Sequence, residues 1–260
     1  MIDHRVLTAA TALIVLVATT PAWADDAPPP PPPQDVWIGK GQFGFLQSKG
    51  NSDAESINGN IDLSRYDGAW KNELLVTGLY GKSADIVSAE RWDARQQTNY
   101  NFSDRLYMFG AFRYEHDLFN GFQYQASLTT GSGYKVIATD ATSLTLQAGV
   151  GYRRLRPETL TMDSSGAVIS RVPLEATGEI IGTAGADYSH KFNATTVLTN
   201  KFLMEAGSDN TMLQDNIALT VKMSTRLALS VGYAVIDNTN PAAPLKKVDT
   251  MTTVNIQFAF

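Results

Sequence analysis

Cysteine is absent from this chain of 260 residues, and histidine occurs only three times. Without thiols the chain has no disulfide, no thiolate metal ligand and no cysteine nucleophile. The formal net charge is −5 and no cluster of lysines and arginines appears, which argues against a nucleic-acid partner. We therefore expect no thiol chemistry, no bound cofactor and no nucleic acid.

Long apolar runs are also missing beyond the N-terminal residues. After residue 24 no stretch approaches the roughly 20 apolar residues that a membrane-spanning helix requires. Only helices and closed β-barrels satisfy every backbone polar group in lipid. If this chain enters a membrane, it must do so as a β-barrel.

The N-terminal residues have the layout of a secretory signal peptide. His4 and Arg5 precede an apolar segment that ends at Thr19, and the sequence Pro-Ala-Trp-Ala then offers an A-x-A cleavage site. The apolar segment is too short to be a membrane anchor. We predict that residues 1–24 are removed by cleavage between Ala24 and Asp25.

Residues 25–35 form a proline-rich linker. Pro28–Pro33 are consecutive prolines, which favour an extended, semi-rigid polyproline II segment without backbone donors. A spacer between the cleavage site and the first strand is the simplest role. A periplasmic docking peptide is the alternative, although nothing in the sequence selects a partner for it.

From residue 36 to residue 260 one pattern repeats. Segments of about ten residues alternate between apolar and polar side chains, separated by Gly, Asn, Asp and Ser, as is typical of transmembrane β-barrels. The pattern predicts an all-β fold, an antiparallel up-and-down barrel of about twelve strands. These strands are Val36–Lys49, Ala54–Tyr66, Trp70–Gly81, Arg91–Phe102, Leu106–His116, Phe122–Tyr134, Ser143–Tyr152, Glu175–Ser189, Thr196–Gly207, Asn210–Lys222, Leu227–Asp237 and Val248–Phe260.

The predicted connections differ between the two ends of the barrel. Every second one is short, as expected of periplasmic turns: 67–69, 103–105, 135–142, 190–195 and 223–226. The others include longer loops, as expected at the extracellular end: 50–53, 82–90, 117–121, 153–174, 208–209 and 238–247. Periodicity leaves open whether the loop 153–174 folds into the lumen or extends outward.

The last predicted strand ends in an alternating apolar run: Val254, Ile256, Phe258 and Phe260. The outer-membrane assembly machinery reads such a run with a terminal aromatic residue. We therefore expect the outer-membrane bilayer as the surroundings, and periplasmic chaperones and the barrel-assembly machinery as partners. The alternative is a water-soluble antiparallel barrel or sandwich with its apolar faces inward, which alternation alone does not exclude.

Charged residues inside the predicted strands are assigned to the lumen. An Arg or Lys that faces lipid at the bilayer midplane costs about 2–4 kcal/mol, and the inward assignment avoids that cost. The lumen-facing candidates are Asp93, Arg95, Arg113, Glu115, Glu179, Lys201 and Glu205. Because both signs occur, these side chains can line a water-filled path or pair with one another and close it.

Two functions fit such a barrel. One is a small pore or transport protein for ions or small polar solutes, and the other is a structural or stress-response envelope barrel with a plugged lumen. An outer-membrane hydrolase is less favoured: His116, between Glu115 and Asp117, is the one catalytic candidate, and no G-x-S-x-G elbow occurs. We predict no enzyme, no catalytic residue and no metal site.

Several segments taken together resemble a known family. They are Ser48–Ser52, Phe109–Asp117, Gly149–Arg154, Glu205–Thr211, Asn216–Lys222 and Lys246–Thr250. On these segments the chain resembles the domain of unknown function 481 family, the YdiY-like salt-induced outer-membrane proteins, over most of residues 37–260. The resemblance implies an outer-membrane β-barrel and no characterised activity, so there are no catalytic residues to carry over. The term salt-induced describes expression and not chemistry.

Overall fold

The computed structural model describes residues 35–48, 54–83, 86–118, 120–162, 168–241 and 245–260. The predicted signal peptide and all but the last residue of the predicted linker lie outside this range, so both stay predictions. Within these residues no helix is long and apolar enough to cross a membrane.

The described residues form thirteen β-strands that follow the alternating segments closely. Their bounds are β1 Val36–Ser48, β2 Ala54–Asp67, β3 Trp70–Ser83, β4 Ile86–Asn101, β5 Leu106–Asp117, β6 Phe122–Ala138, β7 Thr142–Met162, β8 Val168–Pro173, β9 Thr177–Lys191, β10 Thr196–Ala206, β11 Thr211–Lys222, β12 Leu227–Asn238 and β13 Val248–Ala259.

Twelve of these strands close into an antiparallel barrel. Each strand pairs with its neighbours in chain order, β13 pairs with β1, and β6 pairs with β7; only β8 stands outside the ring, paired with the end of β7. The predicted up-and-down barrel of about twelve strands is confirmed. β1 begins and β13 ends at the same rim of the barrel. This rim also carries the short turns after β2, β4, β6, β9 and β11, and we call it the turn rim. The opposite rim is the loop rim.

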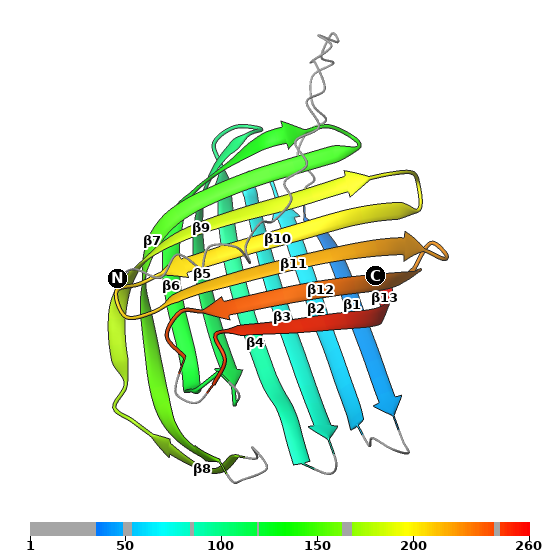
Figure 1. Cartoon of the computed structure of the whole chain (residues 1–260). Helices are drawn as coiled ribbons and strands as arrows, with labels where there is room; N and C mark the ends of the chain where they lie inside the picture. Colours follow the sequence, from blue (N-terminus) through cyan, green and yellow to red (C-terminus); the bar gives the residue numbers. More distant parts are fainter. Residues whose placement is uncertain (1–34, 49–53, 84–85, 119, 163–167, 242–244) are drawn as a thin grey trace, which may run out of the picture. The chain divides into compact units, whose positions relative to one another are not determined.

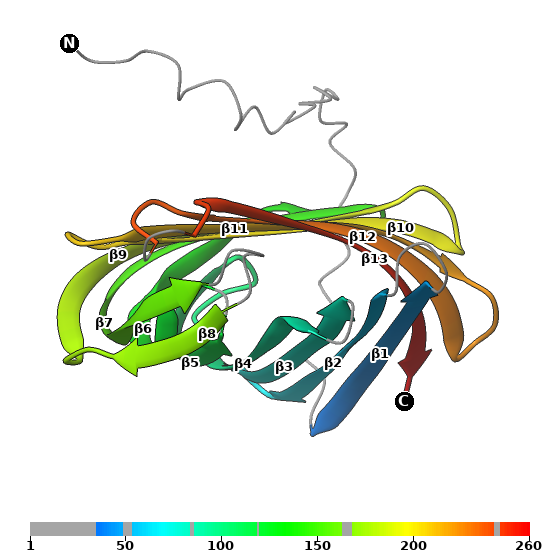
Figure 2. The same cartoon turned by 60° about the horizontal axis from the view of Figure 1, so that its bottom comes forward.

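The barrel wall consists of two layers that cross each other (Figures 1 and 2). Strands β1–β6 form one layer and β9–β13 form the other, and the sheet folds over at β6 and β7. Glycine makes this fold possible. A Cβ atom on Gly131 would collide with the backbone of Ala148 and Gly149, and one on Gly149 would collide with the carbonyl oxygen of Thr130. Side chains at these positions would force the two strands apart.

The distribution of side chains is the inverse of that in a water-soluble protein. Large apolar residues cover the outer surface; Leu128, Val150 and Ile180 are 65%, 62% and 78% exposed. Charged residues are buried inside instead; Arg153 and Glu115 are 0% and 2% exposed. A soluble barrel or sandwich requires the opposite arrangement, so the structure supports the transmembrane alternative.

Three connections differ from the predicted ones. The predicted turn 135–142 is shorter, because β6 continues to Ala138 and β7 begins at Thr142. β4 begins at Ile86 and not at Arg91, and most of the predicted loop 153–174 is a hairpin in which β7 continues to Met162 and pairs with β8. One side of the hairpin is buried, since Glu158 and Leu160 are 4% and 7% exposed. A charged and an apolar residue therefore share that side, and the apolar–polar alternation of the barrel wall does not continue into the hairpin. The hydrophobic pattern therefore marks only the part of β7 that lies in the barrel wall.

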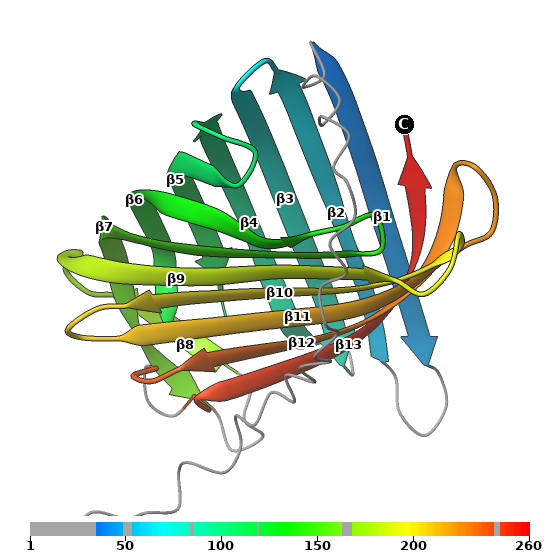
Figure 3. The same cartoon turned by 90° about the horizontal axis from the view of Figure 1, so that it is seen from above.

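The terminal residue takes part in closing the barrel. The backbone N–H of Gly39 donates to the carbonyl oxygen of Phe260 at 2.9 Å, and the N–H of Phe260 donates to the carbonyl oxygen of Gly39 at 3.0 Å. The Phe260 ring lies over Gly39, in the space that a Cβ atom there would need. In Figure 3, β13 reaches β1 only near this end.

We predict that Phe260→Ser lowers the amount of folded barrel in membranes, because it removes both the terminal aromatic and the ring that covers Gly39. The measurement is heat-modifiability on a detergent gel, boiled against unboiled. Phe192→Ser is the matched control, since Phe192 lies in a turn and is 59% exposed against 65% for Phe260. Equal amounts of the heat-modifiable form for both variants would contradict the prediction.

Candidate functional site in the barrel interior

Buried charged side chains gather inside the barrel towards the loop rim. Alternation aims them inward from β4, β5, β7, β9 and β10, and Glu115, Glu179 and Glu205 each lie within two residues of a strand end at that rim. We call the following residues the charge cluster: Arg91, Asp93, Arg113, Glu115, Asp117, Arg153, Glu179 and Glu205. It holds three guanidinium groups and five carboxylates.

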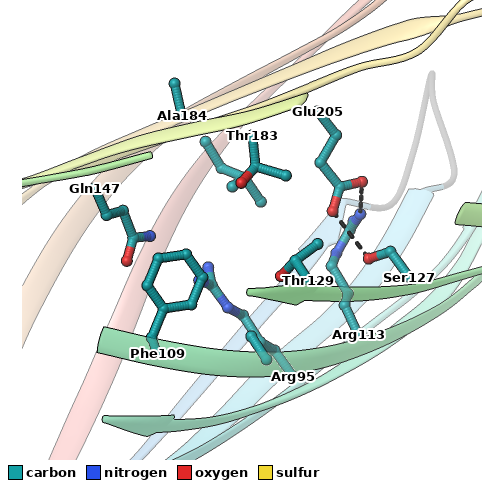
Figure 4. Close-up of a pocket in the computed structure, with 11 residues that line it drawn as sticks. Arg95, Phe109, Arg113, Ser127, Thr129, Gln147, Thr183, Ala184 and Glu205 are labelled. Carbon is teal, nitrogen blue, oxygen red and sulfur yellow. Dashed lines mark hydrogen bonds and ion pairs between the residues drawn. The ribbon is translucent and has the colours of Figure 1, made fainter. Parts of the chain in front are cut away.

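Arg113 on β5 is the centre of the charge cluster. Its Nε donates to Oδ2 of Asp93 at 2.9 Å, and it also pairs with Glu115. Its Nη1 lies 3.4 Å from Oε2 of Glu205, which projects from β10. Because β5 and β10 are not neighbours in the sheet, this contact crosses the lumen (Figure 4). Ser127 donates to the other oxygen of Glu205 at 2.9 Å.

Arg153 extends the charge cluster along the second layer. Its Nη2 donates to Oε1 of Glu179 and to the carbonyl oxygen of Asn210, each at 2.5 Å. Its Nη1 lies 3.9 Å from Oε2 of Glu205, so Glu205 connects the two arginines. The Glu179 carboxylate is held further by the backbone N–H of Asp209 at 2.9 Å.

Arg91 completes the charge cluster on the first layer. Its guanidinium lies 3.6 Å from Oε1 of Glu115 and 3.8 Å from Oδ2 of Asp117. Buried ions are costly unless they are paired and hydrogen-bonded. Arg113 and Arg153 therefore compensate carboxylates on several strands, whereas both partners of Arg91 lie on β5. The Arg113–Glu205 contact connects the two layers.

The other predicted lumen residues have more hydrated surroundings. Nζ of Lys201 on β10 lies 4.0 Å from Oδ2 of Asp62 on β2, and the two side chains stay 58% and 30% exposed. Arg95 donates to Oε1 of Gln97 at 2.6 Å. Since β2 and β10 are not neighbours, the Lys201–Asp62 contact also crosses the lumen, but without excluding water.

A cavity of about 20 Å³ lies beside the charge cluster. Arg95, Phe109, Arg113, Gln147 and Glu205 are among the side chains that line it (Figure 4). Such a volume accommodates about one water molecule, which is too small for an organic substrate. The cavity therefore has room for about one water molecule beside the charge cluster.

The geometry gives the hydrolase hypothesis no support. Nδ1 of His116 lies 2.6 Å from the carbonyl oxygen of Gln123, and the His116 ring is tilted against Trp92. Nδ1 of His190 lies 2.8 Å from the hydroxyl of Thr142 near the turn rim. Across the described strands and connections, no group of three or more His, Asp or Glu residues is arranged to hold a metal ion.

Three residues of the charge cluster do not appear among the predicted lumen residues, namely Arg91, Asp117 and Arg153. All three lie where the predicted strands begin or end, and Asp117 and Arg153 fall in predicted loops. The signal for Arg153 is present in the sequence, because it has the same parity along β7 as the inward-facing Gln147, Gly149 and Gly151. Continuing the alternation past Tyr152 would have found it.

The chain is similar in sequence to one family and to one of its relatives. The model of the family described as "Protein of unknown function, DUF481" matches residues 41–260. The "Uncharacterized protein YdiY" of Escherichia coli strain K12 is 23% identical over 218 residues, which cover 83% of this chain and 80% of YdiY.

Solved membrane barrels show only a distant likeness. The translocator domain of the autotransporter NalP from Neisseria meningitidis is 12% identical with a TM-score of 0.47, covering 86% of this chain and 87% of that one. The KdgM porin in complex with disordered oligogalacturonate is 11% identical with a TM-score of 0.44, covering 86% and 99%. The topology described above rests on the strand pairing of this chain.

We predict that Arg113→Ala lowers the free energy of unfolding of the barrel by about 3–5 kcal/mol, because it leaves buried carboxylates without their cation. The measurement is the denaturant midpoint of the heat-modifiable form. Arg65→Ala is the control: Arg65 pairs with Asp35 at 3.0 Å, but the two side chains are 39% and 69% exposed, so its loss costs about 0–1 kcal/mol. Equal shifts for both variants would show that the charge cluster does not hold the layers together.

Proposed function

This chain belongs to the DUF481 family of proteins of unknown function, and from that premise we propose that it is an outer-membrane β-barrel with a narrow polar pore for ions or small polar solutes. The observation that carries the proposal is the Lys201–Asp62 contact. Two oppositely charged side chains reach across the lumen and remain accessible to water.

The outer surface of the barrel supports the proposed placement in the outer membrane. Most large side chains of the exterior are apolar and exposed, which favours lipid. Apart from the short seam between β1 and β13, the barrel pairs the backbone groups of its strands, as a bilayer requires. Aromatic rings lie near the turn rim, where Trp70 contacts Tyr100 at 4.9 Å and Tyr100 contacts Phe102 at 5.1 Å. Such rings suit the membrane–water interface. Export through the predicted signal peptide and assembly through Phe260 belong to the same proposal.

The pore runs along the part of the lumen that the charge cluster does not fill. Its wall is formed by β1–β3 and by β10–β13, where Asp62, Lys201 and several amide side chains face one another. Exposed charges of both signs attract small ions of either sign without binding them tightly. We expect a small conductance with weak selectivity, since a twelve-stranded barrel is intermediate in width between barrels filled by side chains and open porins.

The charge cluster favours a second candidate function, a closed structural barrel of the cell envelope. Arg113 and Glu205 connect opposite layers and are 6% and 3% exposed, so water does not pass between them. If Lys201 and Asp62 pair in the membrane as closely as Arg113 and Glu205 do, water is excluded there too and the lumen is sealed. Single-channel recording separates the two candidates, because a closed barrel carries no current.

We predict that Lys201→Glu shifts the reversal potential of the pore towards cation selectivity, because it replaces an exposed cation of the lumen by an anion next to Asp62. The measurement is the reversal potential in a planar bilayer under a salt gradient. Lys247→Glu is the control, as Lys247 is exposed in the connection between β12 and β13. A silent wild-type barrel would favour the closed candidate, and identical reversal potentials for the variants would place the current outside this path.

A further inference from the structure

The first and last strands pair over an unusually short stretch. β1 and β13 are in register only from Lys40–Ala259 to Phe43–Ile256, extended at the turn rim by the Gly39–Phe260 hydrogen bonds. On the side away from the seam, both strands are paired along nearly their whole length. β1 pairs with β2 as far as Ser48, and the pairing of β13 with β12 starts at Val248. Figure 3 shows β13 turning away from β1 beyond the shared segment.

The unpaired edges lie at the depth of the apolar surface. Continuing the register would place Phe45 opposite Val254, but this pair does not form. Both side chains are on the outer face and are 55% and 60% exposed. An open strand edge does not persist in hydrocarbon, because each unsatisfied backbone group costs several kcal/mol there. The edges therefore need polar partners that reach them from the lumen or from the membrane.

The lumen directly behind this seam is lined by amides. Nε2 of Gln42 donates to Gln257 at 3.0 Å, and Nδ2 of Asn60 donates to Gln42 at 3.0 Å. Nδ2 of Asn58 on β2 donates to Oδ1 of Asn255 on β13 at 2.8 Å, passing over β1. Amides both donate and accept hydrogen bonds and carry no charge.

Glycine makes the longest of these contacts possible. Gly44 lies on β1 between Asn58 and Asn255, and a Cβ atom there would collide with the side-chain oxygens of both. The amide bridge therefore sits where β1 and β13 begin to part. The charged residues at the neighbouring positions, Lys40 and Asp62, are cross-strand partners of opposite sign, so the site has no strong preference for a charged ligand.

We propose that the seam between β1 and β13 is a lateral opening that binds a single-chain amphiphile with an uncharged, hydroxyl-rich head group. The apolar chain lies between Phe45 and Val254 in the membrane. The head group enters the lumen and exchanges hydrogen bonds with Asn58, Asn255 and the free strand edges. This inference rests on the membrane placement proposed above but not on conduction by the lumen.

The absence of cysteine allows a clean test of the opening. F43C/I256C joins facing positions of the paired segment, and F45C/V254C joins the next outward pair along the same register. A disulfide requires Cα atoms within about 7 Å. We expect F43C/I256C to oxidise readily in proteoliposomes and F45C/V254C to stay reduced. Equal oxidation of both pairs would show a closed seam and overturn the proposal, as would disulfide-linked dimers of F45C, which would assign the edge to a second copy.

The amphiphile is tested with a dodecyl maltoside that carries a photoreactive group on its chain. We expect saturable labelling around Phe45 and Val254, and weaker labelling by a dodecyl sulfate analogue. Asn58→Leu should reduce the maltoside labelling about tenfold, the loss expected when hydrogen bonds to the head group disappear. Asn72→Leu is the control, because Asn72 accepts from Thr98 on the outer face of β3, away from the seam.

The possible failures are distinguishable. All labelling is read on the heat-modifiable barrel, so loss of that form indicates that the membrane placement is wrong, whereas a silent bilayer recording leaves the seam untouched. Non-saturable labelling spread over the whole outer surface would mean ordinary lipid contact and would overturn the proposal. Equal labelling of the Asn58→Leu and Asn72→Leu variants would overturn the role of the amides.

Discussion

The rest of this structure depends on pairing backbone hydrogen bonds where no water is available. In lipid an isolated strand edge is too costly, so a chain without apolar helices can span a bilayer only as a closed ring. That requirement explains why β13 returns to β1 and why Phe260 and Gly39 exchange two backbone hydrogen bonds at 2.9 and 3.0 Å. It also explains why the sheet folds sharply at β6 and β7, where glycines allow the strands to approach.

Closure decides where the charges go. Once the outer face is given to lipid, charged residues of a strand are favoured in the lumen or near a rim, and in the lumen the two layers bring opposite signs together. Asp215 on the outer face of β11 is an exception, and it accepts a hydrogen bond from Nδ2 of Asn200 at 2.6 Å. Where arginine and carboxylate meet at close range, as at Arg113 and Glu205, water is excluded and the barrel is cross-braced. Lys201 and Asp62 also carry opposite charges, but they lie 4.0 Å apart and their side chains are exposed. Water therefore remains in that part of the lumen. The same composition therefore gives a sealed part and a hydrated part of one lumen.

Much of this could be predicted from the sequence, because alternation is a local property that the lipid and the lumen impose on each strand. Strand positions and the inward side of residues such as Arg113 follow from it. Contacts across the lumen do not: the pairing of Arg113 with Glu205 depends on how the two layers cross, which no local pattern records. Arg153 does not follow from the pattern for a different reason, since β7 leaves the barrel wall just beyond it and the apolar signal ends before the strand does.

The length of a seam is likewise invisible to periodicity. Both β1 and β13 alternate along their whole length, yet they share only the segment around Lys40–Phe43, because β13 follows the direction of its own layer and β1 follows the other. Because the two layers cross, the seam between β1 and β13 can be closed at the turn rim and open towards the loop rim. The apolar–polar alternation of the two strands is the same in either case. The amides behind the opening are then the informative feature. These amides supply hydrogen-bond donors and acceptors at the point where the backbone pairing of β1 with β13 stops. They therefore mark the place where a polar head group can bind instead of a strand.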